Sequence, residues 1–261
     1  MTQVFLISAG SILVYMIGWF IAAQIRGRND IADVAWGLGF ILVALVSLAA
    51  GGAYPLRGLL VSLLVLAWGI RLALHIHSRN RGRGEDPRYR KWREEWGKWF
   101  VLRSFLQVFI LQGFLLLLVA VPVIHINAAP AVPLGWLDLT SLAVWLFGFC
   151  FEAFGDWQLR SFIRDPRNKG RLMTSGLWRY TRHPNYFGEV TLWWGIWLMA
   201  LPLPGGWMTE IGPLTITFLI LKVSGIPMLE KPYEERADFQ EYKRRTSAFF
   251  PLPPNTKVQS K

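Results

Sequence analysis

Long apolar runs dominate this sequence, and they constrain its fold more than any other feature. A helix that crosses a membrane needs about 20 mostly apolar residues. The predicted spans are residues 4–23, 31–50, 56–76, 104–124, 139–155, 186–201 and 214–228. Only 17% of the 261 residues are charged, whereas soluble domains carry about 25%. The sequence therefore predicts an all-α integral membrane protein, a seven-transmembrane helix bundle that forms a single domain over residues 1–261.

Lys and Arg are unevenly distributed between these runs. They gather in residues 26–28, 79–103, 160–182 and 231–261, and they are absent from 51–55, 125–138 and 202–213. Cytoplasmic loops of membrane proteins carry an excess of Lys and Arg. The alternation therefore places the N-terminus outside and the C-terminal tail, residues 229–261, in the cytoplasm. Helical spans fit a bacterial inner membrane, with the endoplasmic reticulum as the alternative.

The same distribution argues against nucleic acid as a partner, although the net charge is +11. Membrane topology accounts for the basic blocks, so membrane lipids are the expected neighbours. A single cysteine, Cys150, excludes an intrachain disulfide and any multi-cysteine metal site. His75 and His77 would point to different faces of a helix, so no metal site is predicted.

A polar, arginine-rich stretch precedes the sixth predicted span. It ends in the string Arg-His-Pro-Asn-Tyr-Phe-Gly-Glu at residues 182–189. Upstream, Asp156 and Arg160 lie on one helix face, and Arg164 continues that line. Arginine forks bind phosphates bidentately, and the tyrosines of the stretch can stack on a ring. This combination predicts a site for a phosphate-bearing cofactor. The alternative is that its arginines only fix topology and contact lipid phosphate.

A second polar block follows the last predicted span. It opens with Glu230 and Lys231, and residues 242–251 read Tyr-Lys-Arg-Arg-Thr-Ser-Ala-Phe-Phe-Pro. Taken alone, this block is typical of a solvated amphipathic helix that ends at a proline.

Four motifs together resemble the steroid 5α-reductase superfamily, and most closely its bacterial DUF1295 branch. They are residues 30–37 (Asp-Ile-Ala-Asp-Val-Ala-Trp-Gly), 84–89 (Gly-Glu-Asp-Pro-Arg-Tyr), 182–189 and 242–251. The resemblance covers most of the chain. It implies a seven-helix bundle that encloses NADPH, with cytoplasmic loops over the cofactor. It also implies reduction of a carbon–carbon double bond conjugated to a steroid 3-ketone.

The resemblance further implies which residues bind the cofactor. Arginines would hold the phosphates, and Asn185 with Tyr180 would lie near the ribose–nicotinamide end. The predicted cofactor-binding residues are Arg71, Asp156, Arg160, Arg164, Lys169, Arg171, Tyr180, Arg182, His183, Asn185, Tyr186, Glu189, Glu230, Tyr242 and Arg245. The chain has no Gly-x-Gly-x-x-Gly, so no Rossmann turn would hold NADPH.

Reduction of an enone adds hydride to the β-carbon while negative charge develops on the carbonyl oxygen, so a donor is needed at that oxygen. In the family a tyrosine and an acidic residue of the second and third helical segments provide it. Asp33 and His75 are the predicted catalytic residues here, and the matching tyrosine is not evident. Arg71 has two predicted partners, a cofactor phosphate or Asp33. The predicted residues around the steroid or other apolar enone are Trp36, Trp68 and Tyr89.

Two other functions remain open. Isoprenylcysteine and phospholipid methyltransferases share Arg-His-Pro-x-Tyr-x-Gly and bind S-adenosylmethionine there. They tend to carry an apolar residue after His-Pro and a Glu-Glu pair before the tail, whereas this chain has Asn185 and the pair Glu230-Lys231. Both differences favour the reductase. A lipid- or sterol-binding protein without catalytic activity is the other alternative.

Overall fold

The computed structural model describes residues 1–82 and 84–255, so the end of the predicted tail, residues 256–261, lies outside the described residues. Within those two ranges all regular elements are helical, and the only β-type pairing is an isolated bridge between Thr181 and Ser247. Six helical stretches in this part of the chain are long and apolar enough to cross a membrane: Thr2–Arg26, Ile31–Gly51, Leu56–Asn80, Pro87–Val119, Trp136–Arg164 and Gly206–Tyr233. The predicted all-α, multi-pass membrane protein is confirmed.

Two of the predicted spans differ from these stretches. The span predicted at 186–201 falls on helix α9, Pro184–Ala200, which has 17 residues and lies at the short end of the spanning range. The span predicted at 104–124 ends earlier, because the helix breaks at Ala120 and a new helix starts with Pro122 in its first turn. Proline cannot donate the helical hydrogen bond. The count of seven spans stays a prediction.

The chain forms two compact units. Unit 1 comprises Met1–Leu137 and Met199–Gly212, and unit 2 comprises Asp138–Leu198 and Pro213–Lys261. The prediction of a single domain over 1–261 stays a prediction.

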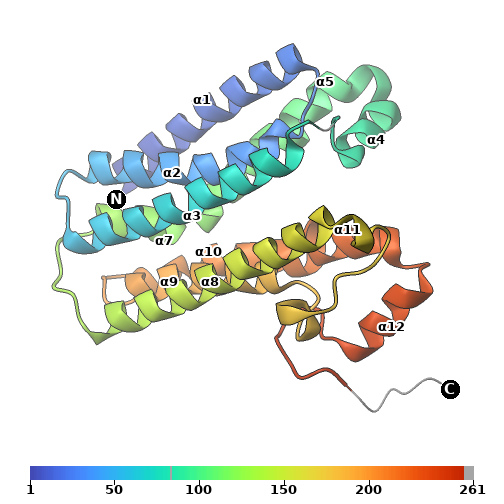
Figure 1. The fold of residues 1–261 in the computed structure, drawn as a ribbon. Helices are drawn as coiled ribbons and strands as arrows, with labels where there is room; N and C mark the ends of the chain where they lie inside the picture. The colour runs from blue at the N-terminus through green and yellow to red at the C-terminus, as the bar shows by residue number, and fades with distance from the viewer. Residues whose placement is uncertain (83, 256–261) are drawn as a thin grey trace. The chain divides into compact units, whose positions relative to one another are not determined.

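Unit 1 is built on three long helices that lie side by side, α1, α2 and α3 (Figure 1). Its elements are α1 (Thr2–Arg26), α2 (Ile31–Gly51), α3 (Leu56–Asn80), α4 (Pro87–Trp96), η1 (Gly97–Trp99), α5 (Phe100–Arg103), the π-helical η2 (Ser104–Ile110), α6 (Leu111–Val119), α7 (Val121–Ala128) and η5 (Gly206–Glu210). A Cβ at Gly37 would lie 2.9 Å from the Gly69 carbonyl oxygen. Small residues at such crossings let membrane helices approach closely, so these glycines set the α2–α3 distance.

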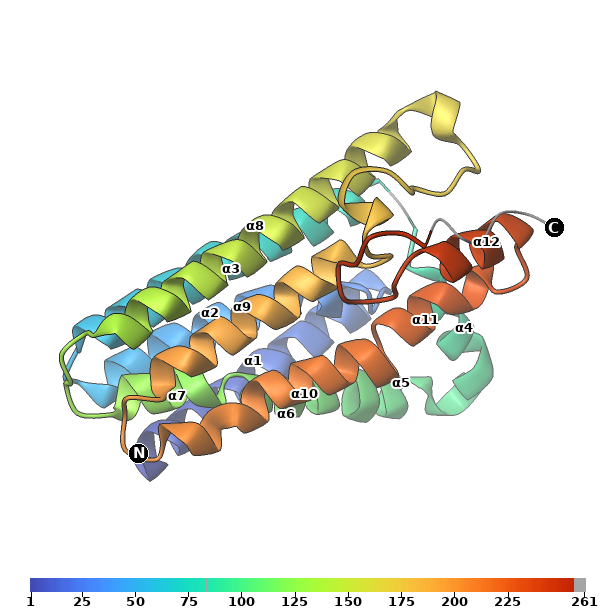
Figure 2. The same ribbon diagram turned by 90° about the horizontal axis from the view of Figure 1, so that it is seen from below.

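Unit 2 places α8 and α9 side by side, as Figure 2 shows. Its elements are α8 (Trp136–Arg164), η3 (Pro166–Asn168), η4 (Gly176–Arg179), α9 (Pro184–Ala200), α10 (Ile211–Phe218), the π-helical η6 (Leu219–Val223), α11 (Ile226–Glu230), η7 (Lys231–Tyr233) and α12 (Ala237–Arg245). A Cβ at Gly148 of α8 would lie 2.5 Å from the Leu192 backbone nitrogen of α9, and one at Gly195 of α9 would lie 2.8 Å from that of Trp145. The two backbones therefore touch, with no room for side chains between them at these positions.

Candidate functional site

Asp33 lies in the first turn of α2 and is the centre of a polar cluster in unit 1. The Tyr89 hydroxyl donates a hydrogen bond of 2.9 Å to Asp33 Oδ1. At Oδ2, Arg88 Nη2 lies 3.1 Å away and Arg79 Nη2 lies 3.6 Å away. The side chain of Asp33 is 22% exposed, against 38% for Arg88 and 45% for Arg79. These four residues are the Asp33 cluster.

The start of α4 fixes Arg88 and Tyr89 in this position. Asp86 caps the helix by accepting from the Arg88 backbone N–H at 2.9 Å, and Pro87 occupies the first turn. The Arg88 side chain also donates to Asp86 from Nε at 3.0 Å. Burial raises the pKa of Asp86, but the bonds from Arg88 outweigh burial and hold this pKa below its usual range.

The loop between α1 and α2 is bonded to the loop that precedes α4. Asp30 accepts two bonds from Arg28, at 2.7 and 2.6 Å, and one from the Asp86 backbone N–H at 3.3 Å. Glu85 accepts from the Asn29 backbone N–H at 2.8 Å. Two of the four sequence motifs, those that contain Asp30 and Glu85, therefore meet in space.

The other predicted polar residues of unit 1 lie on α3. His75 and Arg71 are half-buried there. Tyr89, Arg79 and Arg88 hold the Asp33 carboxylate. The two predicted partners of Arg71, a cofactor phosphate or Asp33, stay predictions. A catalytic role of His75 stays a prediction.

The predicted substrate tryptophans flank one phenylalanine. The Phe40 ring lies 5.0 Å from Trp36 and 5.3 Å from Trp68, centroid to centroid, in edge-to-face geometry. Trp68 is 1% exposed, whereas Trp36 is half-buried. Trp36 is therefore the more accessible of the two.

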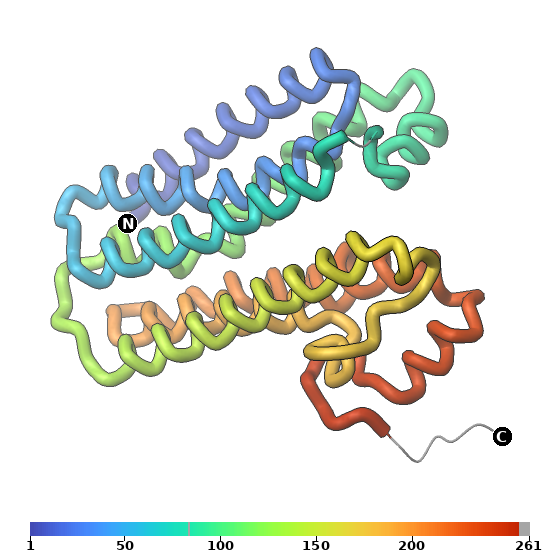
Figure 3. The backbone as a smooth tube through the Cα atoms, viewed as in Figure 1, coloured from blue at the N-terminus to red at the C-terminus, as the bar shows by residue number. Residues whose placement is uncertain are grey.

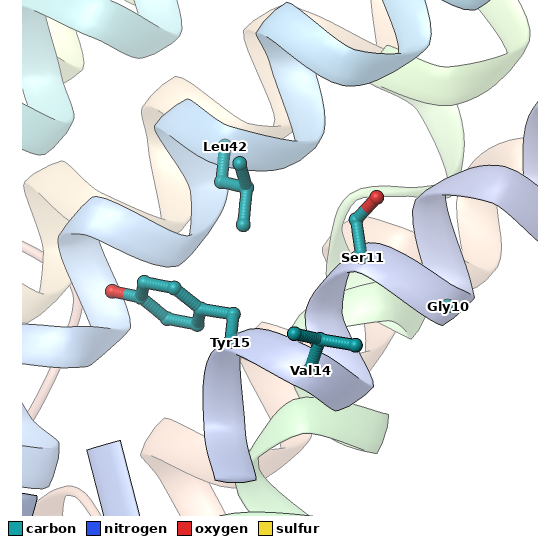
Figure 4. Close-up of a pocket in the computed structure, with 5 residues that line it drawn as sticks. All are labelled: Gly10, Ser11, Val14, Tyr15 and Leu42. Atoms are coloured by element: carbon teal, nitrogen blue, oxygen red, sulfur yellow. The ribbon is translucent and has the colours of Figure 1, made fainter. Parts of the chain in front are cut away.

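A groove of about 520 Å³ lies between α1 and α2, and Figure 4 shows the residues that line it. Its lining consists of Gly10, Ser11, Val14, Tyr15 and Leu42. None of the predicted site residues is among these five. The Tyr15 hydroxyl already donates a hydrogen bond to the Ala35 carbonyl at 3.0 Å. The groove is therefore an apolar surface within the spans and separate from the polar clusters.

Arg182 is buried in unit 2, and each of its three nitrogens has a partner. Nε and Nη2 donate to the carboxylate oxygens of Glu230 at 2.8 and 3.1 Å, and Nη1 donates to the Thr246 carbonyl at 2.5 Å. His183 Nε2 lies 2.9 Å from Glu230 Oε1. The side chains of Arg182, His183 and Glu230 are 6%, 8% and 8% exposed. These three residues and the Thr246 carbonyl form the Arg182 cluster.

The C-terminal segment 246–252 is bonded to the chain beside this cluster. The Arg182 backbone N–H donates to the Ser247 carbonyl at 2.9 Å, and the Leu252 N–H donates to the Tyr180 carbonyl at 3.0 Å. Figure 3 traces the chain from α12 into this segment. The tail is therefore an integral part of unit 2 as far as Leu252.

Tyr242 of α12 adds a further connection. Its hydroxyl donates to the Trp178 carbonyl, and burial raises the pKa of Tyr242. The Trp178 indole N–H donates in turn to the Gly155 carbonyl of α8 at 3.1 Å. α12, η4 and α8 are thus joined through two aromatic side chains.

Asn185 stands in the first turn of α9 against α8. Its Nδ2 donates to Asp156 Oδ1 at 3.1 Å, and a Cβ at Gly155 would lie 3.0 Å from the Asn185 backbone nitrogen. Asn185 Oδ1 is buried and has no hydrogen-bond partner within residues 1–82 and 84–255. A buried acceptor left without a donor is costly, so the N–H group of a bound molecule fits this position.

The remaining predicted cofactor residues of unit 2 range from buried to exposed. Arg164, Lys169, Arg171, Tyr180 and Arg245 are exposed, Arg160 and Tyr186 are half-buried, and Glu189 is buried. Tyr186 stacks on His183 with ring centroids 5.7 Å apart, and Arg245 pairs with Glu241 at 2.9 Å. The structure therefore brings Tyr186 to the Arg182 cluster, whereas Arg245 engages a neighbour on its own helix.

Sequence reasoning missed Arg79 and Arg88 as partners of Asp33, and it missed the Thr246 carbonyl. A signal for Arg88 was present, because the motif at 84–89 carries an arginine beside a tyrosine directly after a capping Asp-Pro pair. The Thr246 carbonyl leaves no signal, since every residue has one. Among the side chains that the structure describes, no group of three or more His, Cys, Asp or Glu could hold a metal ion.

Comparison with known proteins identifies relatives of this chain. The model of a family described as a protein of unknown function, DUF1295, matches residues 19–246. An uncharacterised protein of Schizosaccharomyces pombe is 25% identical over 220 residues, which are 73% of this chain and 63% of the relative.

Two proteins described as 3-oxo-5-alpha-steroid 4-dehydrogenase 1 are similar over shorter stretches. The Bos taurus protein is 31% identical over 122 residues, 45% of this chain and 44% of the relative, and the Mus musculus protein is 37% identical over 68 residues, 26% of each. The chain thus spans less than two thirds of the length of these curated relatives. No solved structure matches it. Because the family model covers most of the sequence, the chain belongs to the DUF1295 family of membrane proteins, within the steroid 5α-reductase-like superfamily.

Proposed function

We propose that this protein uses NADPH to reduce the carbon–carbon double bond of an enone in a flat apolar substrate, with a 3-oxo-Δ4-steroid as the archetype. The 2.9 Å hydrogen bond between Tyr89 and Asp33 carries the proposal. It supplies the phenol and carboxylate that conjugate reduction requires, and it provides a tyrosine that the sequence left unidentified. The similarity to the bovine and mouse 3-oxo-5-alpha-steroid 4-dehydrogenases supports the oxidoreductase class.

NADPH, when bound, supplies the hydride that adds to the β-carbon of the enone. The Tyr89 hydroxyl would stabilise the negative charge that then develops on the carbonyl oxygen, and a proton from solvent would add to the α-carbon to complete the reduction. The hydrogen bond of Tyr89 turns from Asp33 to the ketone when substrate binds. Asp33 tolerates this change, because Arg88 and Arg79 remain as its partners. His75 on α3 is the predicted second group near the ketone, and Trp36 and Trp68 belong to the proposed apolar substrate site.

Asn185 is proposed to bind the carboxamide group of the nicotinamide. Its buried Oδ1 has no donor in the described part of the chain, and a carboxamide N–H₂ would supply one. Asp156 fixes the orientation of the amide by accepting from Nδ2 at 3.1 Å. In unit 2 the proposed ligands of the phosphates are Arg160, Arg164, Lys169 and Arg171, with Tyr180, Tyr186, Glu189 and Arg245 as further cofactor residues. In unit 1, Arg71 keeps its predicted role as a cofactor residue.

The Arg182 cluster has a different proposed role at the same site. The polar atoms of Arg182 and Glu230 are engaged with each other and with Thr246, and Tyr242 is engaged with Trp178. We assign Arg182, His183, Glu230 and Tyr242 the task of holding the first turn of α9, and therefore Asn185, in place.

The proposed topology has seven spans, with α9 as the sixth. The N-terminus lies outside, and the C-terminus and the loops that cover the cofactor lie in the cytoplasm of a bacterial cell with the protein in its inner membrane. Single cysteines introduced into a Cys150→Ser background test this directly. A cysteine at Ser175 should react with a membrane-impermeant maleimide only after the cells are opened. Labelling of that residue in intact cells would contradict the orientation.

Thermal unfolding of the detergent-solubilised protein tests the cofactor. A ligand present at 100 times its dissociation constant adds about 2.7 kcal/mol to the free energy of unfolding. NADPH should raise the melting temperature, and S-adenosylmethionine should not. Asn185→Ala should lose the NADPH shift and the turnover while it stays folded, whereas Asn255→Ala, in the tail, should keep both. A shift with S-adenosylmethionine alone would overturn the reductase in favour of a methyltransferase.

A further inference from the structure

A row of aromatic rings runs from α4 into the apolar part of the fourth span. Trp92 and Trp96 stack with centroids 5.3 Å apart and planes at 9°. Phe100 continues the row at 6.1 Å from Trp96, and Tyr89 begins it at 5.3 Å from Trp92. Tryptophan and tyrosine concentrate where a membrane meets water. The row therefore marks the part of unit 1 that lies at the level of the lipid headgroups.

Cationic side chains lie against this row and the ring that follows it. The Arg103 guanidinium is 5.9 Å from the Trp96 ring centroid, and the Lys98 ammonium is 5.7 Å from that of Trp99. Arg103, Lys98 and Arg90 are exposed. None of these three cations has an ion-pair partner in residues 1–82 and 84–255.

Other basic residues of the same segment are already neutralised. Arg93 pairs with Glu85 at 3.1 Å, and Lys91 pairs with Glu95 at 3.6 Å. Within residues 87–103, the basic side chains that remain without an ion-pair partner in the described part of the chain are therefore Arg90, Lys98 and Arg103.

Large apolar side chains are exposed between Lys98 and Arg103 in the chain. Trp99, Val101 and Leu102 are 55%, 54% and 50% exposed. A soluble phosphate would satisfy the cations and leave this apolar area uncovered. A molecule that joins a phosphate to acyl chains satisfies both, because arginine and lysine bind phosphate while the chains cover the apolar side chains.

We propose that Arg90, Lys98, Trp99 and Arg103 form a binding surface for the headgroup of an anionic phospholipid of the surrounding membrane. The proposal is independent of the reductase activity, because Lys98, Trp99 and Arg103 have no part in the proposed cofactor or substrate site. Each basic residue near an anionic lipid surface strengthens binding by about fivefold.

Native mass spectrometry of the full chain in detergent tests the surface. Phosphatidylglycerol and phosphatidylcholine with identical acyl chains are titrated, and their apparent dissociation constants are compared. The wild type should retain phosphatidylglycerol selectively. The variant Lys98→Gln/Arg103→Gln should bind it roughly 25-fold more weakly and keep its affinity for phosphatidylcholine.

The matched control is Lys231→Gln/Arg244→Gln, which removes the same charge from exposed residues of unit 2 and should bind like the wild type. Equal affinity of the wild type for both lipids, or an equal loss in the control, would overturn the proposal. Competition by glycerol phosphate at the concentration of the lipid would show a site for soluble phosphate instead, which also overturns it. If the double variant fails to fold, Lys98→Gln alone should show a loss of about fivefold.

Discussion

The Asp33 cluster and the Arg182 cluster both pair arginine with a carboxylate, yet they leave their side chains very different freedom. Arg182 and Glu230 are almost fully buried and meet through two bonds of 2.8 and 3.1 Å. Asp33 is 22% exposed, and its arginines lie at 3.1 and 3.6 Å with exposed side chains.

This difference in burial suits the two arginine–carboxylate clusters to two different roles. A buried pair whose polar atoms are all engaged holds its surroundings in one arrangement, because breaking either partner strands a charge. The Asp33 carboxylate is partly exposed and has three partners, so two of them remain when one is exchanged for a ligand. The Arg182 cluster therefore suits a fixed support, and the Asp33 cluster suits direct contact with a substrate.

The largest expected effect concerns activity at the Asp33 cluster. Tyr89→Phe should lower kcat for an enone substrate about 10²- to 10⁴-fold, the range of a positioned proton donor. The melting temperature should change little, because one partly exposed hydrogen bond contributes about 1 kcal/mol. Steady-state kinetics of Tyr89→Phe, compared with those of His75→Gln, measures this loss of kcat. A full rate in Tyr89→Phe together with a large loss in His75→Gln would move the donor role to His75.

The next effect concerns stability at the Arg182 cluster. Glu230→Gln keeps the size of the side chain and leaves Arg182 charged and buried, so the free energy of unfolding should fall by about 3–5 kcal/mol. Glu234→Gln is the control, because Glu234 pairs with Lys243 at 2.8 Å while both side chains are exposed. Such surface pairs contribute about 0–1 kcal/mol. Chemical unfolding in detergent measures both variants, and equal losses would remove the distinction between a buried support and a surface pair.

The smallest effect is a pH dependence at the start of α4. The pKa of Asp86 is lower in the folded protein than its ordinary value of 3.8. Its contribution to stability is therefore present above about pH 3.8 and is lost as the pH falls through the lower folded value.

Wild type and Asp86→Asn should therefore differ by about 1 kcal/mol or less near neutral pH, since the pair with Arg88 is partly exposed. The difference should shrink in acid. Unfolding curves recorded over a pH series test this, and a difference that grows as the pH falls would contradict the direction of the shift.

Sequence patterns predicted the helices well, because apolar length is a local property. They did not predict the break at Ala120, although Pro122 provides a sequence signal for it. They also did not predict the π-helical turns at Ser104–Ile110 and Leu219–Val223. Breaks of this kind occur within a continuous apolar run, and hydropathy alone gives no sign of them.

Sequence patterns selected some members of the two clusters and none of their pairings. Three motifs contain Arg182, Asp33 and Tyr89, and Glu230 opens the second polar block, yet Arg182 and Glu230 lie 48 residues apart and Asp33 and Tyr89 lie 56 apart. No periodicity connects such positions. Tyr89 was therefore expected to contact substrate, and its bond to Asp33 emerged only from the fold.

The long sequence separation between Arg182 and its partners has a consequence for how the protein folds during synthesis. Its partners follow 48 and 64 residues later, at Glu230 and Thr246. A ribosome releases the chain from its N-terminus onward, and domains of growing proteins fold in that order. Arg182 therefore lacks its carboxylate partner until the chain has been extended past Glu230. A chain that stops before Glu230 leaves the Arg182 guanidinium without the carboxylate that neutralises it in the complete fold.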